Sequence, residues 1–216
     1  MKNRITMKQI QIWLITAFLL LYTGQNLFLD ASVPVLALHN GYLINGNGGL
    51  PMENAVILIR GQKIIAVGKK EDIAIPTTAT RINLKGKAVM PGLADMHVHF
   101  MGGWDGKSPE LLGFRNYLHA YLFSGVTTIM DMGNIPPYIL QIRDAVKSGR
   151  ILGPQIYCVG PLIDGVDAQW PAFSVSIASI RQIPGLVRRL KDRHVTFLKA
   201  YKGLSFRQLD QLVDDG

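Results

Sequence analysis

The chain has 216 residues, of which 48% are hydrophobic and 18% charged, with a formal net charge of +8. This size and apolar content suit a globular protein with one or two buried cores. Cys158 is the only cysteine, which excludes an intrachain disulfide, and it lies in an apolar segment, which predicts a small buried residue. The basic excess is dispersed apart from a cluster within residues 188–193, which we interpret as the solvated face of a helix. We therefore expect no nucleic-acid partner.

Residues 1–31 have the pattern of a secretory signal peptide. Three basic residues precede Ile10–Tyr22, a run that is apolar at all but two positions. This run is shorter than the roughly 20 residues that a membrane-spanning helix needs. We therefore expect cleavage, with Ala31 as a candidate last residue of the signal, and no stable membrane span afterwards. The mature protein is expected to be exported, to the periplasm or the extracellular space.

Residues 32–91 contain short β-segments separated by turn residues, which predicts part of a small β-sandwich. Val35–His39 and Tyr42–Ile44 flank Asn40-Gly41, a pair that predicts a two-residue hairpin turn. A second hairpin is predicted around Gly61. Nothing in this segment predicts catalysis.

The Met90–Phe100 segment reads Met-Pro-Gly-Leu-Ala-Asp-Met-His-Val-His-Phe. Its part Leu93–Phe100 predicts a short buried strand that follows a Pro-Gly turn. Side chains alternate along a strand, so His97 and His99 lie on the same side. Two imidazoles at the end of a strand can bind one divalent metal ion. The alternative is a pair of core histidines, but Asp95 on the same side favours a metal site.

From Leu93 onwards, strands and helices alternate, which predicts parallel βα units. The further elements expected are a helix at Pro109–Phe123, a strand at Gly125–Asp131, a helix at Ile139–Lys147, a strand at Gln155–Val159, a helix at Leu186–Arg193, a strand at Val195–Tyr201 and a helix at Ser205–Val213. Trp104 belongs to the glycine-rich loop after the first strand and is expected to overhang that strand's end. Asp164 and Asp167 are interpreted as exposed loop residues.

The strand at Val195–Tyr201 places Lys199 and Tyr201 on one face. A lysine in the middle of a covered strand is costly to bury without a partner or a shifted pKa, and its neutral amine is a nucleophile. The alternative is a lysine that extends from the strand end into solvent. Lys202 is a second candidate, but it lies on the opposite face. Tyr201, nearer the strand's carboxyl end, is expected to border a substrate.

These motifs resemble the metal-dependent amidohydrolase superfamily. Its first barrel strand carries Pro-Gly-x-x-Asp-x-His-x-His, which matches residues 91–99, and its second strand carries Gly-x-Thr-Thr-x-x-Asp, which matches Gly125–Asp131. The order of motifs is similar to the imidazolonepropionase and Xaa-Pro dipeptidase branch. The implied fold is α/β: residues 92–216 would form about four βα units, the N-terminal part of a (β/α)8 TIM-type barrel, after the partial sandwich.

The resemblance also implies a chemistry. His97 and His99 would be metal ligands, and the Lys199 amine would capture carbon dioxide to form a carbamate that bridges two metal ions. Zinc suits imidazole ligands, although ligand type alone leaves manganese and iron open. A metal-activated water would then hydrolyse carbon–nitrogen bonds in small amides, cyclic amides or dipeptides, with Trp104 and Tyr201 beside the substrate.

The family's other ligands and its catalytic aspartate belong to strands five, six and eight, and we assign no catalytic residue within Leu93–Gly216. A TIM-type barrel needs about 250 residues. We therefore expect the N-terminal half of a longer enzyme, inactive alone. One alternative is a non-catalytic secreted remnant that pairs with a second copy or another chain. The other is an unrelated secreted βα binding protein.

Overall fold

The structure, a computed structural model, describes residues 33–100 and 113–216. These residues fall into two units that divide between Pro91 and Gly92. The predicted signal peptide and Trp104 lie outside the described residues, so both stay predictions. Within the described ranges, no helix combines the length and the apolarity needed to cross a membrane.

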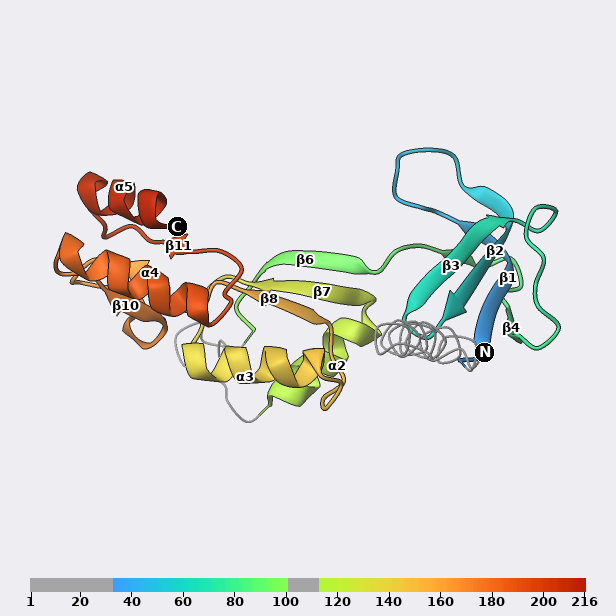
Figure 1. The fold of residues 1–216 in the computed structure, drawn as a ribbon, viewed down its shortest axis with the longest axis horizontal. Coiled ribbons are helices and arrows are strands. Elements are labelled where there is room, and N and C mark those ends of the chain that lie inside the picture. Colours follow the sequence, from blue (N-terminus) through green and yellow to red (C-terminus); the bar gives the residue numbers. More distant parts are fainter. Residues whose placement is uncertain (1–32, 101–112) are drawn as a thin grey trace, which may run out of the picture. The chain divides into compact units, whose positions relative to one another are not determined.

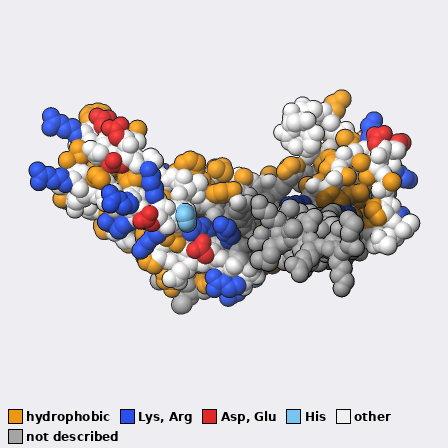
Figure 2. Space-filling view, viewed as in Figure 1, with side chains coloured by type: hydrophobic (Ala, Val, Ile, Leu, Met, Phe, Trp, Pro, Cys, Tyr) orange, Lys and Arg blue, Asp and Glu red, His pale blue; other side chains and the backbone are white. Residues whose placement is uncertain are grey.

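The first unit is a five-stranded sheet in the order β3-β2-β1-β4, with β5 also paired to β1 (Figure 1). Its strands are β1 (Val35–Leu43), β2 (Met52–Arg60), β3 (Lys63–Lys69), β4 (Thr80–Asn83) and β5 (Ala88–Val89). The β1–β2 and β2–β3 pairs are antiparallel, whereas β4 and β5 run parallel to β1. The predicted hairpin around Gly61 is the β2–β3 turn. Figure 2 shows hydrophobic side chains over this sheet, and Ile64, Ile65 and Val67 of β3 are exposed.

The predicted hairpin turn at Asn40-Gly41 is wrong, because β1 continues through these residues. Asn40 has a φ of 60°, and the register with β2 shifts between the His39–Val56 and Gly41–Ala55 pairs. A residue with positive φ beside a register shift is typical of a β-bulge. The Asn-Gly pair is compatible with both a bulge and a turn, and the pairing of β2 along both halves of β1 selects the bulge.

The second unit begins with a parallel sheet in the order β6-β7-β8, as predicted. Its elements are β6 (Leu93–Val98), α2 (Phe114–Phe123), β7 (Val126–Asp131), α3 (Pro136–Lys147) and β8 (Gln155–Cys158). Figure 1 shows α2 and α3 on the same face of this sheet. Apolar side chains of all five elements form one core there, which includes Leu118, Ile129, Ile139 and Ile156.

The prediction that β6 is buried is wrong for most of the strand. Leu93 and Met96 are 50% and 57% exposed, and only Val98 is buried. In the part of the chain that the structure describes, β6 lies at the edge of its sheet, with β7 as its one neighbouring strand. Burial of a barrel strand requires cover on both faces, and sequence pattern alone does not show whether that cover is present.

A second three-stranded sheet, in the order β10-β9-β11, follows β8. It consists of β9 (Leu162–Asp164), β10 (Ser174–Ser176) and β11 (Lys199–Ala200), with the 3-10 turns η1 (Pro171–Phe173) and η2 (Ile180–Gln182) and the helices α4 (Ile183–Asp192) and α5 (Phe206–Asp215). The expected loop after β8 therefore contains two short strands. Basic and acidic side chains are interspersed over the region of α4 and α5 in Figure 2.

The strand predicted at Val195–Tyr201 is much shorter in the structure, where only β11 is regular. Its first part bonds to β8, because the Thr196 N–H donates to the Cys158 carbonyl at 2.8 Å. Its last part bonds to β9, because the Tyr201 N–H donates to the Ile163 carbonyl at 2.8 Å. The change of partner between residues 196 and 199 interrupts the ladder.

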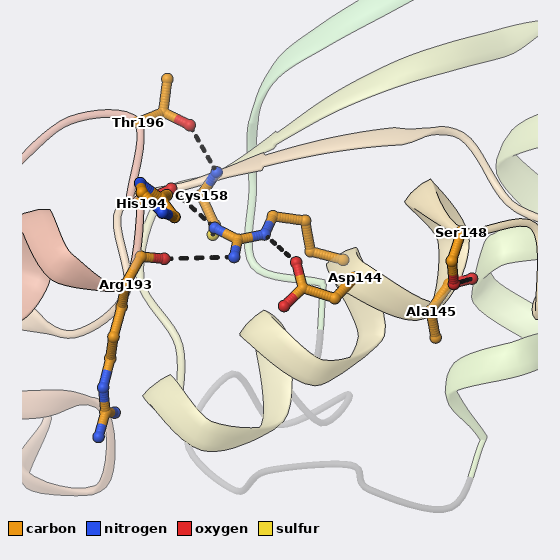
Figure 3. Close-up of polar contacts among 8 residues, drawn as sticks. Asp144, Ala145, Ser148, Cys158, Arg193, His194 and Thr196 are labelled. Carbon is orange, nitrogen blue, oxygen red and sulfur yellow. Dashed lines mark hydrogen bonds and ion pairs between the residues drawn. The ribbon is translucent and has the colours of Figure 1, made fainter.

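Arg143 of α3 joins this helix to the segment that leads into β11. Its guanidinium donates to the carbonyls of His194 and Arg193 at 2.7 and 3.2 Å and pairs with Asp144 at 2.9 Å. Figure 3 shows these groups beside Cys158, which is fully buried as predicted. Burial raises the pKa of the Cys158 thiol, although the nearby guanidinium opposes the effect.

Helix α5 begins as the sequence predicts. The Ser205 hydroxyl accepts from the Gln208 N–H, and the Gln208 side chain accepts from the Ser205 N–H. This reciprocal pair satisfies two N–H groups that a helix start otherwise leaves unbonded.

A candidate metal centre at the carboxyl ends of the strands

His97 and His99 lie at the carboxyl end of β6, on the side opposite Val98. Val98 and Phe100 are buried, whereas both histidines are exposed, so the alternation expected for this stretch is confirmed. The two imidazole centroids are 5.5 Å apart, with an interplanar angle of 62°. The two rings are therefore neighbours in space, as they must be to share one ion.

The ring of His99 is held by a backbone carbonyl. Its Nδ1 lies 3.3 Å from the carbonyl oxygen of Gly133, in the loop after β7. A carbonyl oxygen can only accept, so this contact requires the hydrogen on Nδ1. The Nε2 lone pair is then free to bind a metal ion, an arrangement common for metal-binding histidines.

Asp131, the last residue of β7, lies beneath this contact and is fully buried. Its carboxylate accepts from the Phe100 N–H at 2.9 Å, from the Asn134 side chain at 2.9 Å and from the Gly133 N–H at 3.2 Å. Burial raises the pKa of Asp131, while these hydrogen bonds and the nearby His99 act against that effect. Burial, together with the charges of Asp95 and Asp131, raises the pKa of Tyr121 on α2.

Lys199 is half-buried in β11 and pairs in register with Leu162 of β9. A Cβ atom on Gly133 would lie 3.0 Å from Leu162 Cγ and 3.7 Å from His99 Cε1, so the side chains of Leu162 and His99 both lie close to Gly133. Lys199 thus pairs with Leu162, the Leu162 side chain lies close to Gly133, and the Gly133 carbonyl contacts His99. The described residues contain no hydrogen bond between the Lys199 and His99 side chains.

The expectation that Asp164 is exposed is wrong, because its side chain is 1% exposed. Its carboxylate accepts from the Gly203 N–H at 2.7 Å, the Gly165 N–H at 2.9 Å and the Gln169 N–H at 3.0 Å. These bonds compensate the desolvation of the carboxylate. They also join the loop after β9 to the turn that follows Lys199 and Tyr201. We call these four residues, Asp164, Gly165, Gln169 and Gly203, the Asp164 latch.

Tyr201 is half-buried, and its hydroxyl accepts a hydrogen bond from the Trp170 indole N–H at 3.0 Å. Trp170 lies just beyond the Asp164 latch and was not predicted to contribute to the site. Asp131 and Asp164 were likewise not assigned a role. Each directly follows an apolar pair, Met130 preceding Asp131 and Ile163 preceding Asp164, and this pattern could have identified both as strand-terminal carboxylates.

The donor set at the end of β6 meets part of what a divalent ion needs. Two imidazoles fit zinc and similar ions, and the Gly133 carbonyl orients one of them for ligation. Over the ranges 33–100 and 113–216, no cluster of three or more histidine, cysteine, aspartate or glutamate side chains could hold a metal ion. His97 and His99 are thus a partial ligand set, and their assignment as ligands stays a prediction.

Parallel strands joined by helices, with polar side chains gathered at the strands' carboxyl ends, define the first βα units of a TIM-type barrel. The chain belongs to the amidohydrolase family, which residues 88–202 match. An ochratoxinase of Aspergillus niger is 27% identical over 158 residues, which cover 68% of this chain and 32% of that protein. The family resemblance drawn from the sequence motifs is therefore confirmed.

Solved structures give the same fold. A molinate hydrolase superposes with a TM-score of 0.71 at 24% identity, covering 85% of this chain and 51% of that one. A Xaa-Pro dipeptidase with bound methionine superposes with a TM-score of 0.70 at 20% identity, covering 84% and 53%. The predicted fold class is confirmed. The chain spans about a third of the length of the ochratoxinase and about half of these structures.

Proposed function

We propose that this chain contributes to a metal-dependent hydrolase that cleaves carbon–nitrogen bonds in small amides, cyclic amides or dipeptides. The observation that carries the proposal is the pair of neighbouring, exposed imidazoles at the end of β6, with the Nδ1 of His99 directed at the Gly133 carbonyl. Membership of the amidohydrolase family supports it.

His97 and His99 would supply the imidazole ligands, with zinc as the favoured ion. The Lys199 amine would attack carbon dioxide, forming a nitrogen–carbon bond and releasing a proton, and the resulting carbamate would contribute oxygen ligands. A bound divalent ion supplies Lewis acidity, which lowers the pKa of water and polarises a substrate carbonyl. Tyr201, oriented by Trp170, and Trp104 would border the substrate.

Titration of the chain with zinc, monitored by calorimetry, tests this assignment. Replacing His97 or His99 with alanine is expected to weaken zinc binding by more than about a hundredfold. Loss of a group that hydrogen-bonds to a metal ligand lowers metal affinity by about ten- to a hundredfold, and loss of the ligand itself should lower it further. His119→Ala is the matched control: it removes an exposed imidazole from α2 and should leave binding unchanged. Bicarbonate should strengthen binding in the parent chain but not in Lys199→Met.

Equal zinc affinity in the parent chain and in both His97→Ala and His99→Ala would contradict the metal assignment. The same result would favour the second candidate, a non-catalytic βα binding protein. It would not affect the fold, which rests on the strand pairing and the family match.

We also infer export, on the basis of the basic and apolar sequence of residues 1–31. The protein isolated from its own cells is expected to begin near residue 32 and to occur outside the cytoplasm. Intact mass and N-terminal sequencing of cell fractions measure both. A cytoplasmic protein that retains Met1 and residues 2–31 would be evidence against export.

A further inference from the structure

Asp131 holds the two pieces of backbone that flank the His99 side chain. The residue after His99 is Phe100, whose N–H donates to Asp131 Oδ2 at 2.9 Å. The Gly133 N–H donates to Asp131 Oδ1 at 3.2 Å, and the Gly133 carbonyl contacts His99 Nδ1 at 3.3 Å. The buried Asp131 carboxylate thus constrains His99 in two ways. It binds the N–H of the next residue, Phe100, and it binds the N–H of Gly133, whose carbonyl contacts the His99 ring.

The geometry of Gly133 makes this constraint specific. Its φ of 148° is a conformation that favours glycine. A side chain there would also collide with Leu162. Both features favour glycine at this position, where its N–H is directed at Asp131 and its carbonyl at His99.

Asp131 itself is fully buried, and its carboxylate oxygens accept from three donors. It cannot reach a substrate in solvent. Its role is accordingly to orient other groups, and the group at the end of its hydrogen-bond network is an exposed imidazole.

We propose that Asp131 is a positioning residue that fixes the ring orientation and the tautomer of His99, with the hydrogen on Nδ1 and the Nε2 lone pair directed outward. The link from this tautomer to metal binding rests on the proposed function. The tautomer itself does not, because it follows from the contact between His99 Nδ1 and the Gly133 carbonyl, and Asp131 orients Gly133 through its N–H. The two proposals can therefore fail separately.

Nitrogen-15 NMR of the histidine-labelled chain at pH 8, where a free histidine is neutral, tests the proposal. The sequence has five histidines, and His99→Gln assigns the signal of interest. His99 is expected to show the Nδ1–H tautomer in the parent chain. In Asp131→Asn, an amide NH2 replaces one acceptor oxygen, so this preference should be lost and zinc affinity should fall by about ten- to a hundredfold.

Asp164→Asn is the matched control, since Asp164 is also buried and also accepts three N–H groups. It should destabilise the same unit without changing the His99 tautomer. An Nε2–H tautomer in the parent chain would overturn the proposal, and so would an unchanged tautomer in Asp131→Asn. If Asp131→Asn does not fold, an Nε2–H tautomer in the parent chain would still overturn the proposal. Loss of the Nδ1–H tautomer in Asp131→Asn, with no zinc binding by the parent chain, would support the role of Asp131 and count against the metal-dependent function.

Discussion

Gly165→Ala is expected to destabilise the second unit by about 3 kcal/mol, because the added methyl group has no space. The new Cβ would overlap the carbonyl oxygen of Gly203. Both partners are backbone, so neither can rotate away as a side chain would. Gly165 is buried, and the Gly203 N–H is bonded to Asp164, which further limits relaxation.

Gly185→Ala is the matched control, because the same substitution in the same unit should have the opposite sign. Gly185 lies in α4, and the heavy atom nearest to an added Cβ is Nη1 of the flexible Arg189 side chain, at 3.6 Å. Alanine is favoured over glycine in helix interiors by up to about 1 kcal/mol. Gly185→Ala should therefore stabilise the unit.

The rate at which a thiol reagent labels Cys158 reports both effects. Cys158 is the only cysteine and is fully buried, so labelling requires the second unit to open. Gly165→Ala should accelerate labelling by about a hundredfold, since each 1.4 kcal/mol corresponds to about tenfold, and Gly185→Ala should slow it. A Gly165→Ala chain that is labelled at the parent rate would show that the backbone contact is not limiting.

Asp164→Ala is expected to cost about 3 kcal/mol, because it leaves the N–H groups of Gly165, Gln169 and Gly203 without their acceptor. The loop that carries Trp170 should then separate from the turn after β11, and the hydrogen bond from Trp170 to Tyr201 should weaken. Urea unfolding gives the stability, and the Trp170 indole N–H resonance reports the contact.

Asp164→Asn is expected to be less damaging, since an amide keeps one acceptor oxygen. Gly165→Ala combined with Asp164→Ala should cost less than the sum of the single changes, because both disrupt the Asp164 latch. Full additivity would indicate that the Gly165–Gly203 contact and the Asp164 hydrogen bonds stabilise the unit independently. An unchanged urea midpoint in Asp164→Ala would show that the three N–H groups find other partners.

The part of the candidate site that His97 and His99 form could be predicted, because it depends on residues that are neighbours in the sequence. The alternation of His97 and His99 with buried neighbours depends only on strand geometry. The sequence therefore predicted the common face of the two histidines correctly, whereas it did not predict their exposure. The role of Lys199 depends on whether a strand partner and a ligand approach its amine, and the pairing with Leu162 could not be read from residues 195–201 alone.

The sequence by itself determined the order of βα units, the start of α5 at Ser205, the burial of Cys158 and the common face of the two histidines. These features depend on residues within a few positions of one another. Tertiary structure alone decided the exposure of β6, the bulge at Asn40 and the burial of Asp164. The carboxylate of Asp164 is buried because Gly203, 39 positions later, supplies an N–H and a surface without a side chain. A short sequence window contains neither partner, so hydrophobic periodicity cannot predict that contact.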